Sequence, residues 1–551
     1  MAVKTQYRTP DARSRILYII GCWLLVTGCY SKVKSGKKIF AYNETTGIAS
    51  LDPAFAKNQS TMWPAHQLFN TLVQVDDSLH IVPSLARRWV IADDRLSFTF
   101  YLRDDVFFHD DDAFPGGEGR KLTASDVAYS LTRIMAKQTA SPGAWIFNRK
   151  VDSLHPFVAI DDTTFRLNLQ RPFHPILGIL SMQYCSIVAK EAVEKYGSDF
   201  RRHPVGTGPF QFVAWEEGQA LILKKNPHYF EKDSAGNRLP YLDGIKISFY
   251  DSKATEFLLF RQKQISFLND IDASFKDEIL TKKGTLRKGW EETISLRVNP
   301  YLNTEYLGIL VDSSNDKIKN SPLRLVKIRQ AMNYGFDRRK MILYLRNSLG
   351  TAAESGFVPM GLPSFDSSAV KGYTYNPEKS RQLLAEAGFP DGRGLPLIKL
   401  LTIPIYAEMA NYIARQLEEV GINVQVETVQ KSLLFDMTSN STAPFFRAGW
   451  IADYPDAENY LSVFYSKNPA PPNYTRYKNP HFDALYERAL LEESDSLRYR
   501  LYQEADQAMI KDAPVIPLWY DKVIWLVQTN LVHFRPNALN LLELRQVNIA
   551  D

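Results

Sequence analysis

Apolar and polar residues alternate along several short stretches of the chain, and this alternation predicts β-strands. In residues 96–102 every second residue is leucine or phenylalanine, the two-residue period of a strand with one buried face. Residues 210–213 (FQFV) and 245–249 (IKISF) follow the same period. We therefore expect strands in the first half of the chain, each with one face on a core.

Other stretches have the period and the end signals of helices. Residues 123–126 (TASD) have the spacing of a capping box and precede a helical apolar pattern in residues 127–135. Residues 322–331 begin with proline, and residues 378–387 are followed by glycine, which are favourable residues at helix starts and ends. We expect a helix in each of these three segments.

One segment predicts a complete crossover unit. An apolar run at 397–403 is followed by an amphipathic stretch at 407–420, and then by a glycine and an alternating run through residue 429. This order of strand, helix, turn and strand indicates a βαβ unit with parallel strands. Together with the alternating segments it predicts an α/β fold with mixed sheets.

The first 28 residues resemble an export signal. Residues 1–15 are polar and basic, and residues 16–28 form an apolar run that is too short to span a bilayer and fits the core of a signal peptide. The run ends in residues 26–29 (VTGC), which resemble the lipobox of bacterial lipoproteins. We predict a signal peptide at 1–28, lipidation of Cys29 and a polar tether at 29–37; the alternative is a short buried helix with a stray cysteine.

Charge and composition exclude several functions. Apolar residues make up 45% and charged residues 23% of the 551 residues, as in ordinary globular proteins. Beyond residue 28 the chain has 62 basic and 60 acidic residues, so no basic surface for nucleic acid is indicated. Cys185 would be the single cysteine between residue 30 and the C-terminus; it can form no internal disulfide there, and we expect it to be buried.

Catalytic and cofactor motifs are not found in the sequence. There is no nucleophile elbow, no zinc-protease motif and no phosphate-binding loop. Residues 109–112 (HDDD) could be drawn as a metal cluster, but adjacent side chains rarely converge on one ion, and a proline and two glycines follow at 115–117. We interpret this segment as a solvated loop, and we expect no metal and no cofactor.

Several segments, in the same order, resemble the family-5 extracellular solute-binding proteins of peptide ABC transporters. The resemblance runs from about residue 51 to the C-terminus. Each segment is short, but their shared order is specific. The segments are 51–53 (LDP), 83–86 (PSLA), 98–103 (FTFYLR), 122–127 (LTASDV), 205–210 (VGTGPF), 226–229 (NPHY), 328–331 (IRQA) and 383–388 (LLAEAG).

The resemblance implies a three-lobed fold like that of periplasmic binding proteins, with a hinged ligand cleft between two main lobes. Lobe I would be discontinuous and comprise residues 38–70, 194–300 and 523–551. Lobe II would comprise residues 71–193, and lobe III residues 301–522. Two crossings between lobes I and III would form the hinge, and ligand would close the cleft because it binds the closed state better.

Residues 447–454 (RAGWIADY) resemble the ligand-contact segment of the oligopeptide-binding members. The resemblance implies that Asp453 pairs with the N-terminal ammonium of a peptide and that Arg447 meets its carboxylate. Trp450 would line a side-chain pocket, and Tyr454 belongs to the same segment. A buried carboxylate offsets the cost of desolvating an ammonium, and a guanidinium matches a carboxylate; the alternative is that Asp453 caps a turn and Arg447 is a surface charge.

A second segment adds candidate contacts to the predicted site, and two positions differ from the oligopeptide-binding members of the family. Residues 54–60 resemble the stretch whose backbone pairs with the peptide, so Asn58 and Gln59 are candidate contacts, or else loop residues. The position after residues 139–142 is aromatic in oligopeptide binders and is Gly143 here, and Trp145 could substitute for it. At 431–433 the chain has KSL where such members have a tryptophan before a Thr-Phe pair, so part of the aromatic pocket wall differs.

We therefore expect a substrate-binding lipoprotein of an ABC importer, not an enzyme. It would be monomeric, extracytoplasmic and anchored by its lipid, and it would deliver peptides to a membrane permease. Two alternatives stay open: the same fold binding nickel, haem or a glycan, and a secreted hydrolase with a catalytic set assembled from distant residues.

Overall fold

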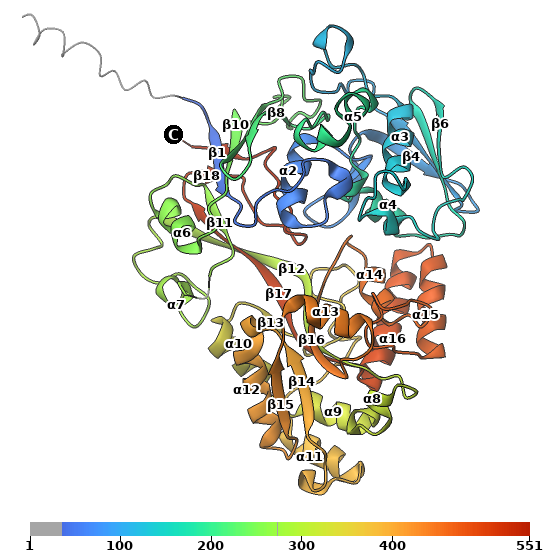
Figure 1. The fold of residues 1–551 in the computed structure, drawn as a ribbon, viewed down its shortest axis with the longest axis vertical. Coiled ribbons are helices and arrows are strands. Elements are labelled where there is room, and N and C mark those ends of the chain that lie inside the picture. Colours follow the sequence, from blue (N-terminus) through green and yellow to red (C-terminus); the bar gives the residue numbers. More distant parts are fainter. Residues whose placement is uncertain (1–35, 273, 551) are drawn as a thin grey trace, which may run out of the picture. The chain divides into compact units, whose positions relative to one another are not determined.

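The computed structural model describes residues 36–272 and 274–550, and the described residues from 39 onward belong to one unit (Figure 1). The predicted signal peptide and the lipidation site at Cys29 lie outside the described residues. Within the described part of the chain, no helix combines the length and the apolar character needed to cross a membrane.

A four-stranded sheet joins segments from both ends of the first half of the chain. Its first strand pairs in parallel with β10, and the other pairs are antiparallel. The alternation at 245–249 is confirmed, because Ile245 and Ile247 are buried in the core. The strands, in sheet order, are β1 (Ile39–Asn43), β10 (Gly244–Ser248), β9 (Ala220–Lys225) and β8 (Phe210–Glu216).

A second four-stranded sheet is antiparallel throughout and lies between residues 86 and 168. The predicted alternation is confirmed, because Phe98, Phe100 and Leu102 are buried. Its strands, in sheet order, are β4 (Ala86–Ile91), β5 (Ser97–Leu102), β7 (Thr164–Asn168) and β6 (Phe157–Asp161). The predicted helix is α3 (Ala124–Met135), and its capping box between Thr123 and Asp126 is present.

The third sheet has seven strands and contains the predicted crossover. Strand β14 pairs in parallel with β15, and α12 (Ala407–Glu418) connects them, as expected from residues 397–429. The strands are β11 (Phe267–Asn269), β17 (Val515–Gln528), β12 (Ile294–Ile309), β16 (Phe445–Ile451), β14 (Ile398–Thr402) and β15 (Val424–Thr428), with β13 (Thr351–Ala352) beside β17.

Two long strands connect the upper and lower parts of the unit. Strands β12 and β17 run side by side from one part to the other (Figure 1). Their antiparallel register places Pro300 opposite Lys522, and a register shift follows between Pro300 and Thr304. The expected boundaries between lobes I and III therefore lie at one strand pair, in the middle of two continuous strands. The division into lobes itself stays a prediction.

One predicted helix is interrupted. Residues Pro322–Arg324 form a 3₁₀ turn, Leu325 is extended, and α9 (Val326–Tyr334) begins after it. The buried guanidinium of Arg329 donates Nη1 to the carbonyl oxygens of Leu323 (2.9 Å) and Arg324 (3.1 Å). These carbonyls have lost their helical partners, and Arg329 satisfies them instead.

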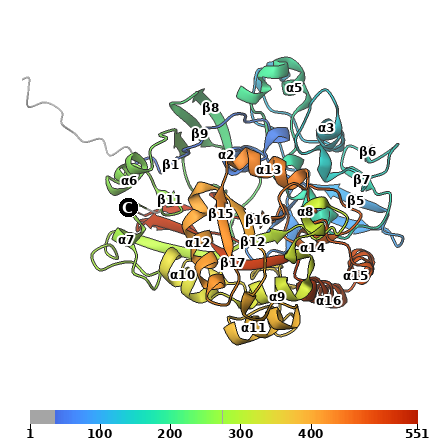
Figure 2. The ribbon, with the colours of Figure 1, turned by 60° about the horizontal axis from the view of Figure 1, so that its bottom comes forward.

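Helices cover the sheets in both views, and α15 and α16 pack side by side (Figures 1 and 2). The remaining α-helices and short strand pairs complete the unit. They are α2 (Gln59–Leu68), α4 (Ile176–Leu180), α5 (Lys190–Tyr196), α6 (Lys253–Arg261), α7 (Lys276–Ile279), α8 (Asp316–Lys319), α10 (Arg338–Arg346), α11 (Pro377–Glu386), α13 (Lys431–Ser439), α14 (Glu458–Leu461), α15 (Pro480–Leu491) and α16 (Asp495–Asp512), with β2 (Val73–Val75) beside β3 (Ile81–Pro83) and β18 (Leu531–Val532) beside β19 (Asn548–Ile549).

Candidate ligand-binding site

A cavity of about 1110 Å³ lies between segments from all three predicted lobes. Its volume exceeds the usual range of small-molecule sites, roughly 300–1,000 Å³. The walls come from the start of α2, from residues 181–186, from β17, from residues 451–455 and from the C-terminal segment. Five of the predicted site residues line it: Asn58, Gln59, Trp145, Asp453 and Tyr454.

Arg447 and Trp450 are not among the residues that line this cavity. Arg447 lies in β16, where Nη2 donates to the carboxylate of Glu305 on β12, and its Cζ is 3.5 Å from the centre of the Tyr406 ring. The guanidinium is thus already neutralised by a buried carboxylate. The structure brings Arg447 to Glu305 and not to the cavity wall, because the two strands pair in that register.

Asp453 follows the end of β16 and is held by a single buried asparagine. The backbone nitrogen of Asp453 donates to Asn459 Oδ1 (3.2 Å), and Asn459 Nδ2 donates to Asp453 Oδ2 (3.3 Å). Trp450 Nε1 donates to the same Asn459 Oδ1 (3.0 Å). Asn459, on α14, therefore fixes the position of the Asp453 carboxylate, and the hydrogen bond from Trp450 holds the amide of Asn459 in place.

The carboxylate of Asp453 lacks an ion-pair partner among the described residues. Its side chain is exposed to the cavity, whose walls surround it on several sides. Desolvation raises the pKa of Asp453, while the hydrogen bond from Asn459 and the charge of Lys150 act in the opposite direction. The site therefore holds a negative charge that a cationic group of a ligand could balance.

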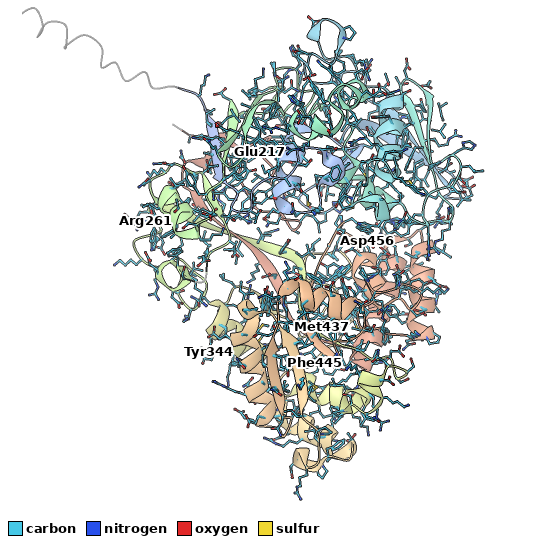
Figure 3. All side chains as sticks on the ribbon, viewed as in Figure 1. Glu217, Arg261, Tyr344, Met437, Phe445 and Asp456 are labelled. Carbon is cyan, nitrogen blue, oxygen red and sulfur yellow. The ribbon has the colours of Figure 1, made fainter. Side chains whose placement is uncertain are left out.

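The positive charge of Lys150 acts on the carboxylates of Asp453 and Glu458. Desolvation lowers the pKa of its ammonium, and the charges of Glu458 and Asp453 oppose this shift. Lys150 belongs to predicted lobe II and Asp453 to lobe III. Figure 3 labels Asp456, three residues after Asp453, where this segment faces the upper part of the unit.

Tyr454 contributes both a hydrogen bond and packing beside the cavity. It is buried, and its hydroxyl donates to the carboxylate of Glu458, which also accepts from Tyr486. A Cβ atom at Gly178 would lie 3.4 Å from Cβ of Tyr454. Tyr454 thus fixes the contact between α4 and the Asp453 segment.

Asn58 and Gln59 begin α2 at the cavity. Asn58 is the N-cap, and its Oδ1 accepts from Thr61 N (3.2 Å). Gln59 Oε1 accepts from Asn269 Nδ2 (3.0 Å). The side-chain oxygens of both residues are used within the protein, so the amide NH₂ groups are what they can offer to a ligand.

Tyr184 is a cavity residue that the sequence did not single out. A Cβ atom at Gly143 would come within 2.4 Å of Tyr184 Cδ1, so the tyrosine ring fills the place of a side chain at position 143. Burial, and after it the charge of Asp453, raise the pKa of Tyr184 to about 12. The glycine at an expected aromatic position was the signal for this ring.

Two other sequence features have structural roles. Cys185 is buried, as expected. His109 is buried, and its Nε2 lies 2.9 Å from the carbonyl oxygen of Gly208; burial lowers its pKa to about 4. No group of residues that could hold a metal ion occurs within residues 36–272 and 274–550.

Comparison with protein families decides the relationship. Residues 80–472 match the family model "Bacterial extracellular solute-binding proteins, family 5 Middle". The chain belongs to this family. The fold class expected from the sequence is thereby confirmed, and the solute-binding protein can be compared with its relatives.

Curated relatives cover nearly the whole solute-binding protein. It is 25% identical over 533 residues to the glutathione-binding protein GsiB of Salmonella paratyphi A, covering 94% of this chain and 96% of the relative. It is 28% identical over 514 residues to heme-binding protein A of Haemophilus influenzae, covering 88% and 87%.

Solved structures share the fold. The ABC transporter-associated periplasmic binding protein DppA from Helicobacter pylori, in complex with the peptide STSA, gives a TM-score of 0.72 at 24% identity and covers 93% of this chain and 98% of its own. HbpA2 from Haemophilus parasuis gives a TM-score of 0.79 at 23% identity and covers 93% and 100%. At these identities the likeness establishes the fold alone.

The fit between Gly143 and Tyr184 can be tested by Gly143→Ala in the solute-binding protein. The added methyl group must displace the buried ring, and overpacking of this kind costs about 1–3 kcal/mol. We expect a lower midpoint of chemical unfolding and a weaker ligand affinity. In a Tyr184→Ala background the space is free, so the same substitution should be nearly neutral; an equal loss in both backgrounds contradicts the contact.

Proposed function

We propose that this solute-binding protein is the substrate-binding component of an ABC importer and captures peptides through their N-terminal ammonium at Asp453. The observation that carries the proposal is the Asp453 carboxylate: it faces a large cavity, has no ion-pair partner among the described residues and is fixed by Asn459. An ammonium in an enclosed cleft needs a charged partner, because an unpaired buried charge costs several kcal/mol. One rigid carboxylate meets that need and sets the register of the peptide.

The relatives support this class of ligand and leave one alternative. One relative is named a glutathione-binding protein, and one structural neighbour is a complex with a four-residue peptide. Another relative is named for haem, so a nonpeptide ligand on the same fold is the second candidate, in line with the nickel, haem and glycan alternatives. Asp453 can pair with an ammonium group, and this favours a peptide over a nonpeptide ligand.

In transport, this protein would bind the ligand, and a separate permease would carry it across the membrane. The ligand would close the cleft between the lobes joined by β12 and β17, and the closed form would dock on a membrane permease. The family consists of solute-binding proteins of transporters, not enzymes. A hydrolase activity is tested directly by incubating the protein with a mixture of peptides and searching for new fragments.

Mass spectrometry of the material released from the purified protein by mild denaturation tests the proposed function. We expect peptides with unmodified N-termini. Release of haem, a nickel complex or an oligosaccharide, together with no binding of peptides in calorimetry, would favour the second candidate. Fragmentation of added peptides by the native protein would favour the hydrolase.

The membrane anchor is the second part of the proposal, and it rests on residues 26–29 (VTGC). We expect the protein expressed in bacteria to fractionate with membranes and to carry acyl chains on Cys29. Cys29→Ser removes the acceptor thiol, so that variant should be soluble or retain its signal peptide. Cys185→Ser is the matched control, because Cys185 is buried in the core. Wild-type protein without an acyl chain on Cys29 contradicts the anchor.

A further inference from the structure

Arg535 lines the cavity and has no carboxylate partner among the described residues, and Arg297 contacts the segment that precedes it. Arg297, on β12, donates Nη1 to the carbonyl oxygen of Phe534 and Nη2 to that of Leu531 (3.0 Å). Arg535 directly follows Phe534, and its exposed side chain lines the cavity. The backbone just before Arg535 therefore contacts the guanidinium of Arg297 through two carbonyl oxygens.

The charges of this pair are not balanced within the described part of the chain, where neither guanidinium forms an ion pair. Burial, and after it the charge of Arg535, lower the pKa of Arg297. The other two arginines of the cavity wall are paired: Arg346 with Asp521 (3.0 Å), and Arg545 with two glutamates. The charge of Arg297 adds to the positive potential at Arg535, and an anion bound from the cavity would balance it.

The segment that holds Arg535 is rigid. The ring of Phe534 is fully buried and stacks on Trp525 at 4.6 Å between ring centres. Trp525 Nε1 donates to Asn269 Oδ1 (3.0 Å) and to Asn540 Oδ1 (3.2 Å). These contacts fix the backbone from which the side chain of Arg535 extends into the cavity.

We infer that Arg535, supported by Arg297, is an anion site that receives a carboxylate of the bound ligand. This inference rests on the proposed function and adds a second anchor to it. A guanidinium presents a planar fork of donors that matches two carboxylate oxygens. Arg447, to which the sequence assigned this role, is occupied by Glu305. A ligand with an ammonium at Asp453 and a carboxylate at Arg535 would pair both of these charges.

The test uses Arg535→Gln in the full chain. Arg393→Gln is the matched control, because Arg393 is exposed and pairs only with the exposed Asp391. The probes are alanine peptides of three to five residues, each as the free acid and as the C-terminal amide, measured by calorimetry. Inorganic phosphate is the second probe, measured by its effect on the unfolding temperature.

Charge-assisted hydrogen bonds predict the size of the effect. We expect Arg535→Gln to weaken the binding of the free acids about ten- to hundredfold and to leave the amides nearly unchanged, while Arg393→Gln changes neither. Equal effects of Arg535→Gln on acids and amides overturn the inference.

The phosphate measurement distinguishes a carboxylate of the ligand from a free anion, and it does not require that a peptide binds. Suppose that phosphate stabilises the wild type but not Arg535→Gln, and that acids and amides bind equally well. The site would then bind a free anion, and the inference that it receives a carboxylate of the ligand would be wrong. If no alanine peptide binds the wild type, the peptide proposal fails by itself. The anion site then stands only if phosphate stabilises the wild type more than Arg535→Gln, and it falls if the two respond equally.

Discussion

Replacement of Asp453 by asparagine is expected to weaken the binding of peptides with a free N-terminus at least about thirtyfold. The substitution keeps the shape of the side chain and its contact with Asn459 while it removes the charge. The ammonium of the ligand then stays enclosed with a neutral acceptor. Loss of one partner of a buried, hydrogen-bonded charge pair costs roughly 2–5 kcal/mol, and 1.4 kcal/mol is a factor of about ten in affinity.

N-acetylated peptides provide the control on the ligand, because they lack the ammonium. They should bind the wild type poorly and lose much less from Asp453→Asn. Calorimetry with two proteins and two ligands is a double-mutant cycle, and Asp391→Asn, an exposed aspartate with one surface ion pair, controls for the change in net charge. If acetylation and Asp453→Asn act additively, ammonium and carboxylate do not meet.

The same carboxylate predicts a pH dependence of binding. Desolvation raises the pKa of Asp453 in the free protein above its ordinary value of 3.8. The charged form binds the ammonium, so affinity should be full above the raised pKa and should fall as the pH decreases through it. The loss should therefore begin at a higher pH than for an ordinary aspartate, and it should be absent in Asp453→Asn.

Elements with local signals could be predicted from the sequence. The βαβ unit of β14, α12 and β15 follows from apolar periods within about 30 residues, and the capping box of α3 lies within four residues. Both depend on interactions between neighbours along the chain. The place of Asp453 in the cavity wall could be predicted because a contiguous segment, residues 447–454, resembles a known ligand segment.

Contacts between distant segments could not be predicted in this way. Arg447 and Glu305 are 142 residues apart, and they meet because β12 and β16 pair in one particular register. Tyr184 meets Gly143, and Arg297 meets the segment before Arg535, also across long separations in the sequence. A register set by the packing of the sheet has no local sequence signal, so the sequence assigned Arg447 to the ligand although its partner is in the protein.

The ion pair of Glu305 and Arg447 gives the second prediction with a large expected effect: Glu305→Gln should destabilise the protein by roughly 3–5 kcal/mol. This is the usual cost of removing one partner of a buried ion pair, since the other charge stays behind uncompensated. The site is built for a carboxylate: Gly449 lies opposite Glu305 in the sheet, and a Cβ atom there would come within 2.8 Å of Oε1. Asn303 Nδ2 also donates to this oxygen (3.2 Å).

Chemical denaturation of four proteins tests this prediction and the role of Arg447 together. The proteins are the wild type, Glu305→Gln, Arg447→Met and the double variant Glu305→Leu with Arg447→Met. Desolvation raises the pKa of Glu305 although Arg447 opposes the shift, so burial of this pair is costly and an apolar replacement of both partners should recover most of the stability. A double variant that is no more stable than Glu305→Gln contradicts the ion pair as the cause. If a peptide with a free carboxylate restores the stability of Glu305→Gln and its amide does not, Arg447 binds the carboxylate of the ligand. We expect no such rescue, because Arg447 is not part of the cavity wall.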